Sequence, residues 1–558
     1  MDTKKRTALL SVYNKKDLEI FAKELVALDW QIVSSGGTAK YLKENGIEVV
    51  DVADLTGMPA ILSHRVATLH PKIHGGLLAL DTEEHRSEMQ KYNIPWIDMV
   101  CVDFYPLKKE IEDMNSTSDS VIEKTDIGGP TMIRAGAKGG RIVICDFEDR
   151  LKVIDWLKAG EPEKEKFLKI LRAKAEFVVA EYSATSGEYH SDGEYKSIFG
   201  VKDYTCAYGE NAYQKPAFFY KRNDSNDTLA IEHWKQVGGS PMSYNNLCDL
   251  DRMIQTTTHI GAGFEKNLNK IPFIAIGVKH GNPCGAGVSF ESEIDALEKM
   301  LLGDLRAIFG GMVMLNFPVT EKIAEEVLHK YTGEGKRLLD MVAGPSFTEE
   351  AIEILSRKKG KCRLVQNIAI QNAGQNSLDT KERTRCVRGG FLVQPNYIFV
   401  PDLMDLAVVK HKAEDFDIKD VILAWAVGST SNSNTITIVK EGRLCGNGVG
   451  QQDRVGASKL AIARADDSFN FMIENNLASD LIQNILDKKN IDLKKATAYS
   501  DSFFPFNDAP EILIERGVNT IFTTSGSVND EMFLELAKNK QINVIMLPDA
   551  EARGFYQH

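Results

Sequence analysis

The chain has 558 residues, of which 43% are hydrophobic and 26% are charged, and its formal net charge is −12. This length exceeds what one hydrophobic core usually organises, so more than one domain is expected. The acidic balance argues against binding nucleic acid through a basic surface, and no apolar run reaches membrane-spanning length, so neither nucleic acid nor membrane is an expected partner.

The first elements predict a phosphate-binding turn. Residues Thr7–Val12 have the apolar pattern of a buried strand, and an amphipathic helix follows. A second strand, Trp30–Ser35, ends in the run Ser34-Ser35-Gly36-Gly37-Thr38, and a helix is expected from Ala39. Backbone N–H groups, hydroxyls and a helix N-terminus converge in such a turn and favour an anion. The alternative is an ordinary strand-to-helix turn capped by Thr38.

Three further segments carry charged or polar groups. Residues Arg65–Gly76 are basic and contain histidines without a neighbouring acid or cysteine, which favours a loop over an anionic ligand rather than a metal site. Residues Met99–Tyr105 are predicted to form a strand with Tyr105 at its end. Residues 125–138 predict a glycine turn that opens a helix, with Arg134 and Lys138 on one face. A solvated helix face is the alternative.

A cation and an imidazole end the next clear strand. The β-branched run Phe273–Val278 predicts a buried strand that stops at Lys279-His280. The following residues, 281–287, contain glycines and Asn-Pro, which predict a tight loop. Ligands of open α/β sheets bind at strand ends, so this pair suits acid–base work on a weak nucleophile. A solvated lysine beside a capping histidine is the alternative.

The remaining segments suggest a domain boundary and two more candidate loops. Helical patterns dominate residues 150–199, so we expect a boundary near residue 200. Residues Gly446–Arg454 predict a glycine turn that carries a cation, and Ser500–Asp508 places aromatic rings beside a carboxylate. Such rings can stack on a flat ligand. From the residues alone, a place in the hydrophobic core is the stronger interpretation of these phenylalanines.

The eight cysteines are scattered, and none belongs to a Cys-x-x-Cys pair, so neither a zinc ribbon nor a redox motif is indicated. Met1 is followed by a charged segment rather than by the apolar stretch of a signal peptide. A reducing cytoplasm is therefore the expected location.

The N-terminal motifs, Ser34–Thr38, Arg65–Gly76, Tyr105-Pro106 and Asp126–Arg134, together resemble the IMP cyclohydrolase part of the bifunctional AICAR transformylase/IMP cyclohydrolase family of purine biosynthesis. The resemblance implies a methylglyoxal-synthase-like α/β domain with a helical linker over residues 1–199. Such a domain closes the purine ring of formyl-AICAR with loss of water. The residues implied as catalytic are Tyr105, Asp126 and Lys138. The residues implied to bind the nucleotide are Ser11, Lys15, Ser35, Gly36, Gly37, Thr38, Arg65, Thr68 and Lys72.

The C-terminal motifs, Tyr208–Asn211, Ser243–Asp249 and Lys279–Gly285, resemble the transformylase part of the same family. The implied fold is a duplicated cytidine-deaminase-like α/β unit, with subdomains at 200–368 and 369–558. The implied reaction transfers a formyl group from 10-formyltetrahydrofolate to AICAR, in a homodimer. The residues implied as catalytic are Lys279, His280 and Asn432. The residues implied to hold AICAR and folate are Tyr208, Phe309, Gly310, Asp340, Arg454, Phe503, Phe506 and Asp508.

The sequence departs from the family pattern in both parts. Ala67 stands where the family has lysine, so we expect a weakened or lost cyclisation, unless Lys72 supplies the missing cation. Ala207 stands where the family has arginine, so we expect the transformylase part to hold the nucleotide phosphate more weakly or in a different way. A transformylase alone, or a silent nucleotide-binding paralogue, are the alternatives. Zinc deaminases need a second cysteine after Pro-Cys, and Pro283-Cys284 lacks it, so no catalytic metal is expected.

Overall fold

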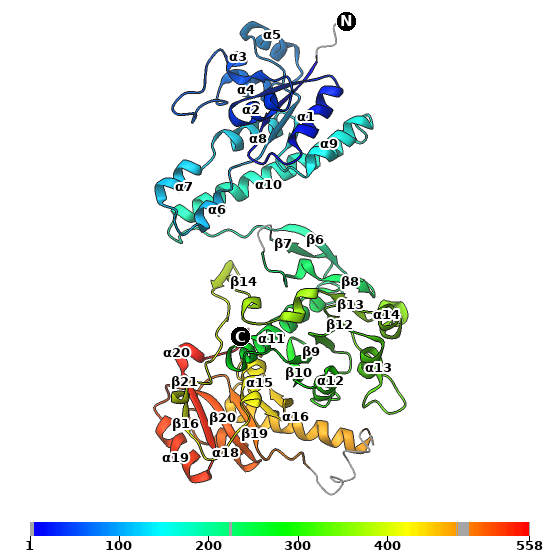
Figure 1. The fold of residues 1–558 in the computed structure, drawn as a ribbon, viewed down its shortest axis with the longest axis vertical. Coiled ribbons are helices and arrows are strands. Elements are labelled where there is room, and N and C mark those ends of the chain that lie inside the picture. The colour runs from blue at the N-terminus through cyan, green and yellow to red at the C-terminus, as the bar shows by residue number, and fades with distance from the viewer. Residues whose placement is uncertain (1–4, 223–225, 476, 478–489, 557–558) are drawn as a thin grey trace. The chain divides into compact units, whose positions relative to one another are not determined.

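The computed structural model describes residues 5–222, 226–475, 477 and 490–556. The chain separates into two compact units, Met1–Phe199 and Gly200–His558, and each has its own sheet and hydrophobic cores (Figure 1). The further division between residues 368 and 369 stays a prediction.

The first unit is built on a parallel sheet of five strands. Their spatial order is β3 (Val50–Asp51), β2 (Trp30–Ser34), β1 (Arg6–Ser11), β4 (Met99–Val102) and β5 (Ile142–Ile144). Successive side chains of a strand face opposite sides, and Leu9 and Leu10 of β1 are fully buried in different clusters. Both faces of this sheet are therefore covered, as is usual for parallel sheets.

Helices form both covering layers of the first unit. In chain order they are α1 (Leu18–Ala27), α2 (Gly36–Glu44), α3 (Val52–Thr56), α4 (Pro71–Leu78), α5 (Glu83–Tyr92), α6 (Leu107–Glu112), α7 (Ser118–Lys124), α8 (Gly128–Lys138), α9 (Asp149–Lys158) and α10 (Lys164–His190). Helices α1, α2 and α9 share one hydrophobic cluster with the sheet. Helices α4, α8 and α10 share the cluster on the other face.

Two predicted boundaries in this unit were wrong. Helix α2 begins at Gly36 rather than Ala39, so the glycine pair forms its first turn. Strand β4 ends at Val102 and not at Tyr105. The reason is that its partner strand β1 ends at Ser11, which pairs with Val102. Asp103, the residue after β4, uses its carboxylate to accept the N–H of Asn14 in the loop after β1.

The second unit contains one mixed sheet of twelve described strands. In spatial order they are β16 (Val409–His411), β21 (Asn543–Pro548), β20 (Val518–Ser525), β19 (Ala496–Ser500), β17 (Ile436–Lys440), β18 (Arg443–Gly448), β10 (Asn282–Ser289), β9 (Phe273–Lys279), β11 (Met312–Leu315), β12 (Met341–Gly344), β13 (Arg363–Gln366) and β8 (Lys235–Gly238). Two hairpins stand apart from it, β6 (Val201–Cys206) with β7 (Ala217–Lys221), and β14 (Arg383–Val387) with β15 (Gly390–Gln394).

Helices cover both faces of the large sheet. They are α11 (Tyr244–Leu268), α12 (Glu293–Leu301), α13 (Glu321–His329), α14 (Glu349–Leu355), α15 (Ile418–Ser429), α16 (Arg454–Glu474), α18 (Asp508–Glu515), α19 (Asp530–Lys540) and α20 (Asp549–Ala552). Short 3₁₀ helices lie in the connections, at η1 (Ile231–His233), η2 (Lys358–Gly360), η3 (Ile368–Asn372), η4 (Gln375–Ser377) and η5 (Leu406–Val408). Helices α11 and α15 pack together in the largest hydrophobic cluster.

Two of the glycines after His280 were wrongly predicted to form a loop. Gly281 does lie in a turn with His280, at φ angles of +74° and +54°, but Gly285 and Gly287 belong to β10, which pairs antiparallel with β9 through that turn. Glycine is needed in β10 because α12 lies directly over it: a Cβ at Gly285 would be 2.4 Å from a backbone oxygen of that helix. The glycines of β18 were likewise wrongly assigned to a turn. They are needed because α16 packs closely on this strand: a Cβ at Gly446 would be 2.0 Å from a backbone oxygen of that helix.

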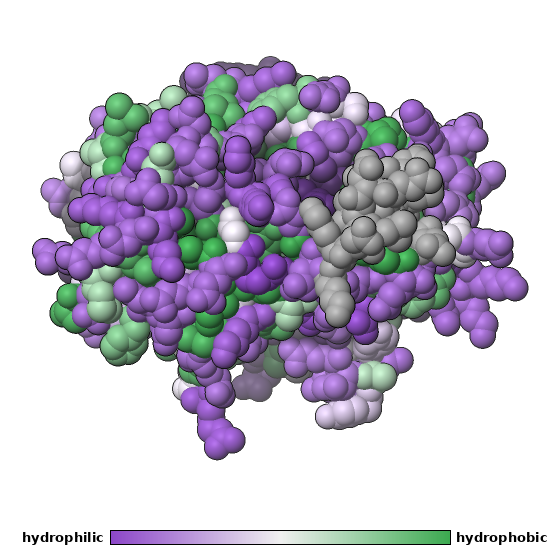
Figure 2. All heavy atoms as spheres, turned by 90° about the horizontal axis from the view of Figure 1, so that it is seen from below, coloured by the Kyte–Doolittle hydropathy of each residue, from purple (hydrophilic) through white to green (hydrophobic). Residues whose placement is uncertain are grey.

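The surface contrasts with these cores. On the face drawn in Figure 2, hydrophilic side chains predominate, and hydrophobic residues appear between them in small groups. Among the described helices, none combines the length and the apolar character that crossing a bilayer requires.

A buried carboxylate fixes the start of α15, the helix that leads to Asn432. Asp420 is 4% exposed and accepts the backbone N–H groups of Glu441 and Gly442, at 2.8 and 2.6 Å. Burial raises the pKa of Asp420 to about 6. Replacing Asp420 by alanine leaves both N–H groups without this acceptor, so we expect the free energy of unfolding of the second unit to fall by about 2 kcal/mol.

Denaturant unfolding followed by circular dichroism measures this change. Asp415→Ala is the matched control, because that aspartate side chain is 98% exposed, and we expect its effect to stay below about 0.5 kcal/mol. Equal stability of the Asp420 and Asp415 variants would contradict the role given to Asp420.

Candidate functional sites

A cavity of about 1500 Å³ opens in the first unit, beyond the carboxyl ends of β1, β2 and β4. This is where parallel α/β sheets bind ligands. The sequence-predicted residues that line it are Ser11, Lys15, Ser35, Gly36, Gly37, Thr38, Arg65, Thr68, Tyr105 and Asp126. Side chains from five separate segments of the chain are thus brought to one space.

The turn between β2 and α2 presents an anion-binding helix end to this cavity. Ser35 caps α2 in an extended conformation, and Gly36 has φ +53°, a left-handed value that glycine adopts without strain. A Cβ added at Gly36 or Gly37 would meet nothing within 4 Å, so the backbone here borders open space. The first N–H groups of a helix lack partners inside the helix and can donate to an anion.

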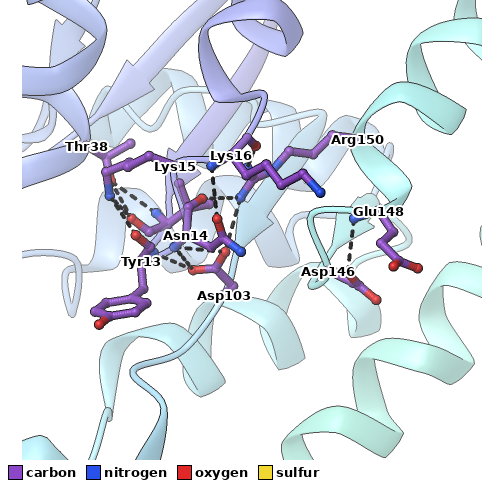
Figure 3. Close-up of polar contacts among 10 residues, drawn as sticks. Tyr13, Asn14, Lys15, Lys16, Thr38, Asp103, Asp146, Glu148 and Arg150 are labelled. Carbon is purple, nitrogen blue, oxygen red and sulfur yellow. Dashed lines mark hydrogen bonds and ion pairs between the residues drawn. The ribbon is translucent and has the colours of Figure 1, made fainter. Parts of the chain in front are cut away.

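Lys15 and Thr38 close one wall of the cavity. The Thr38 hydroxyl donates to the carbonyl of Val12 at 3.0 Å and accepts its N–H at 3.1 Å, which ties α2 to the end of β1. The Lys15 ammonium donates to the Val12 carbonyl and lies 3.4 Å from the Thr38 hydroxyl (Figure 3). Burial lowers the pKa of Lys15. The cation is therefore held near the turn that favours an anion.

An ion pair that sequence reasoning missed shapes the same loop. Asp103 accepts the backbone N–H groups of Tyr13 and Asn14, and Arg150 donates to Asp103 at 3.1 Å (Figure 3). Arg150 is 1% exposed and also donates to the backbone carbonyls of Asn14 and Lys16. No sequence signal links Arg150 to a loop 134 residues earlier, because the pairing exists only in the folded unit.

Asp126 stands just before α8 and also lines the cavity. Its carboxylate accepts the Gly129 N–H at 2.9 Å, and its own N–H donates to the Tyr182 hydroxyl at 2.7 Å. Burial raises the pKa of Asp126, against the effect of the N–H groups. A Cβ at Gly128 would lie 3.0 Å from the Thr68 hydroxyl, so Thr68 belongs to the same corner.

Two predicted residues are placed elsewhere. Among the described residues that line the large cavity, neither Lys72 nor Lys138 occurs. Lys72 donates to the carbonyl of Leu55 at 3.0 Å. Lys138 is the last residue of α8, about 16 Å along the helix from its start, and lines a separate cavity of about 440 Å³. Ala67, by contrast, does line the large cavity.

In the second unit, the turn after β9 joins two predicted segments. The Lys279 ammonium donates to the carbonyl of Phe309 at 2.8 Å, and a Cβ at Gly310 would be 4.0 Å from the same nitrogen. Asp340 is tied to this segment through its N–H, which donates to the Gly311 carbonyl at 2.9 Å. Four predicted site residues therefore lie close together in the fold: Lys279, Phe309, Gly310 and Asp340.

Asn432 reaches that place from the other half of the sheet. Its N–H donates to the Asn282 side-chain oxygen at 3.1 Å, and the Asn282 amide donates to the His280 carbonyl at 3.3 Å. Arg454 lies beyond it and donates to Asp501 at 3.2 Å, and Asp501 also accepts the hydroxyl of Ser433. Lys279, His280, Asn432 and Arg454 thus form a connected series.

The remaining predicted residues are not joined to this series by the contacts found among the described residues. The Tyr208 carbonyl accepts the N–H of Tyr244 at the start of α11. Phe503 is partly buried and Phe506 is 61% exposed, while Phe504 between them is in the core, and Asp508 is the first residue of α18. No group of three or more described His, Cys, Asp and Glu residues could hold a metal ion.

A family model described as "AICARFT/IMPCHase bienzyme" matches residues 140–464, and one described as "MGS-like domain" matches residues 17–131. The chain belongs to the AICARFT/IMPCHase bienzyme family. The family resemblance and the predicted function are thereby confirmed: the chain is an AICAR formyltransferase and IMP cyclohydrolase of de novo purine biosynthesis, which uses a folate as formyl donor.

Full-length relatives agree with the family match. The bifunctional purine biosynthesis protein PurH of Anoxybacillus flavithermus is 36% identical, over 97% of this chain and 98% of its own length. The proteins of the same name from Thermoanaerobacter sp. and Prochlorococcus marinus are 34% and 35% identical, over 97% and 96% of this chain and 98% of their own. A solved structure titled "Crystal structure of ForH" covers 34% of this chain and all of its own, at 32% identity and a TM-score of 0.31.

Proposed function

We propose that the large cavity of the first unit is where formyl-AICAR is cyclised, and that formyl transfer to AICAR from 10-formyltetrahydrofolate takes place at the His280 turn. The observation that carries the first assignment is the convergence of the predicted nucleotide residues on one cavity. The connection of Lys279, His280 and Asn432 by side-chain and backbone hydrogen bonds supports the second.

In the cyclisation, an amide nitrogen attacks a formamide carbon of the same molecule, so holding the substrate in the reactive geometry supplies much of the rate. The Ser35–Thr38 turn and Lys15 hold the nucleotide phosphate, and Arg65 and Thr68 lie on the opposite loop. Tyr105 donates to the developing oxyanion, and Asp126 moves the proton. The proposal gives no catalytic step to Lys72 or Lys138, whose side chains lie outside the described cavity lining.

The raised pKa of Asp126 makes the cyclisation pH-dependent. A proton acceptor must be ionised, and the ionised form is lost as the pH falls through a pKa that lies above the ordinary aspartate value. We therefore expect kcat for cyclisation to fall at low pH, with a midpoint above about 4. Asp126→Asn removes the acceptor, and we expect kcat to fall by about 100-fold or more.

Cyclisation of supplied formyl-AICAR, followed between about pH 4 and pH 8, measures both effects. Asp119→Asn, which changes an exposed aspartate of α7, is the control and should keep the wild-type profile. A variant at Asp126 that retained the wild-type rate would contradict the role proposed for this residue.

For formyl transfer, the AICAR amine is a weak nucleophile that must lose a proton as it attacks the formyl carbon. His280 accepts that proton, Lys279 stabilises the oxyanion, and Asn432 supports the formyl oxygen. The bond between the formyl carbon and the folate nitrogen then breaks, and that nitrogen takes up the proton that His280 removed, so that tetrahydrofolate leaves as the free amine. Arg454, at the end of the connected series, and Asp340, beside the Phe309–Gly311 segment, hold the substrates. Tyr208, Phe309, Gly310, Phe503, Phe506 and Asp508 complete the proposed binding residues.

We also propose that the second unit is an internal duplication with halves on either side of residues 368 and 369. Read from each edge inward, the strands run β8-β13-β12-β11-β9-β10 and β16-β21-β20-β19-β17-β18. Parallel and antiparallel pairings match at every step. Failure of residues 235–366 to superpose on residues 409–548 in this order would contradict it.

A homodimer in the cytoplasm is the proposed state of the enzyme. The β14–β15 hairpin exposes Phe391, Leu392 and Val393, whose exposed fractions are 38%, 60% and 37%, and a partner chain could cover them. The eight free cysteines are typical of a reducing compartment. Light scattering on the purified protein should give twice the 62.0 kDa mass of one chain, and a mass of 62.0 kDa would contradict the dimer.

A further inference from the structure

Two charged residues of α11 contact the proposed formyl-transfer site from behind. Asp249 and Arg252 are one helical turn apart, and their exposed fractions are 9% and 4%. The Asp249 carboxylate accepts the Gly281 N–H at 2.6 Å, directly after His280. The Arg252 guanidinium lies 3.4 Å from the side-chain oxygen of Asn432. The same turn of one helix therefore contacts the side chain of Asn432 and the backbone of Gly281, the residue after His280.

These contacts close a ring. From His280 the ring passes through Asn282 to the backbone of Asn432, then through its side chain to Arg252, along α11 to Asp249, and back to the His280 turn. A Cβ added at Gly281 would lie 3.9 Å from both the Arg252 guanidinium and the Asp249 carboxylate. Both charged groups consequently border the turn itself, in addition to their separate hydrogen bonds.

We propose that Asp249 and Arg252 are positioning residues for formyl transfer: through this hydrogen-bonded ring they hold the His280 turn and the Asn432 amide in fixed relative positions. This inference rests on the proposed function, which assigns His280 and Asn432 to the reaction. It adds two residues that touch neither substrate and act through others.

Arg252 also determines which way the Asn432 amide faces. A guanidinium only donates hydrogen bonds, so the oxygen of the Asn432 side chain faces Arg252 and its amide nitrogen, a donor, is turned away from Arg252. A donor is what a formyl oxygen requires as negative charge develops on it. Arg252 is itself anchored, because it donates to the carbonyls of Thr430 and Tyr556 at 2.6 and 3.0 Å.

Asp249 acts on the other side of the ring. The His280 turn has two consecutive residues with positive φ. The direction of the His280 side chain depends on the backbone of this turn, so it is fixed only when that backbone is fixed. The carboxylate holds that backbone at Gly281. Burial raises the pKa of Asp249, while the Gly281 N–H, His280 and Arg252 favour its ionised form.

The test compares steady-state formyl transfer by the full-length enzyme and its variants. Asp249→Ala is expected to lower kcat by about 10- to 100-fold, while the KM for AICAR stays within about three-fold, because geometry is lost and not the binding of the substrate. Asp249→Asn keeps an oxygen that can accept the Gly281 N–H and should recover a large part of the loss. Glu265→Gln, near the other end of the same helix where its carboxylate accepts the Gln375 N–H, is the control and should stay within about two-fold of wild type.

A double-mutant cycle separates positioning from general structural support. Arg252→Met should lower kcat by about ten-fold or more in the wild-type background, but by less than about two-fold when Asn432 is already alanine. If Arg252→Met does not fold, as judged by circular dichroism, Arg252→Lys takes its place in the cycle, because one ammonium cannot reach all three acceptors.

The outcomes distinguish this inference from the proposed function. If His280→Ala and Asn432→Ala keep wild-type formyl transfer, the proposed site is wrong and the positioning roles fall with it. If those two variants lose activity while Asp249→Ala keeps more than half of kcat, or if the Arg252 and Asn432 losses multiply, only the positioning inference is overturned.

Discussion

Replacing His280 by alanine is expected to lower kcat for formyl transfer by about 1000-fold or more and to leave cyclisation of supplied formyl-AICAR unchanged. The large effect follows from the weakness of the nucleophile, since without a proton acceptor the attacking amine develops a full positive charge. We expect the second reaction to be spared because the cavity proposed for it lies within the first unit. An assay with AICAR and 10-formyltetrahydrofolate, with both products separated by chromatography, measures the two activities in one protein.

The control for this experiment is His329→Ala, which changes a histidine of the same unit whose side chain is 50% exposed and close to Glu325. We expect it to keep both activities. A His280 variant with more than about a tenth of the wild-type kcat for formyl transfer would contradict general base catalysis by this residue. Loss of AICAR binding in the same variant would instead indicate a role in holding the substrate.

The local patterns of the first unit were sufficient to predict most of the polar residues that line its large cavity. The order of strand, Ser-Gly turn and helix around Ser35–Thr38 depends on neighbours in the sequence, and parallel strands bring their carboxyl ends to one edge. Arg150 could not be predicted in this way. Its contacts with Asp103 and with the backbone of the loop after β1 join segments that are 47 and more residues apart.

The second unit shows a different limit of sequence reasoning. The glycines of β10 and β18 have the composition of a loop, yet they lie in strands because helices pack at backbone distance against them. A glycine that is required by close packing and a glycine that is required by a turn look alike in the sequence. Asp249 was visible as part of a motif, but its target at Gly281 appears only when α11 is placed behind the turn.

The cation distribution in the first unit bears on its catalytic rate. Arg65 is paired with Glu123, and Lys15 donates to the Val12 carbonyl. Lys72 is hydrogen-bonded to Leu55 and is absent from the described lining of the cavity, so it does not replace the lysine that the family has at position 67. Ala67 itself faces this cavity, between Arg65 and Thr68.

Replacing Ala67 by lysine is therefore expected to raise kcat for cyclisation by about ten-fold or more, which corresponds to about 1.4 kcal/mol of added transition-state stabilisation. The new ammonium would enter the cavity that Tyr105 and Asp126 also line, where we propose that the oxyanion develops. Stopped-flow or continuous absorbance measurements with saturating formyl-AICAR give the rate. The KM should fall as well if the cation also contacts the substrate before the reaction.

Leu62→Lys is the matched control for this gain. It adds the same charge to the same segment, at a residue that is 69% exposed and is not among the described residues lining the cavity, so it should leave the rate unchanged. A gain that is equal in both variants would mean that the added charge acts at long range by attracting the anionic substrate, and high salt would then remove it. A rate that stays at the wild-type value after Ala67→Lys would show that the cavity already provides the stabilisation that the family's lysine supplies, from cations such as Lys15 and Arg65.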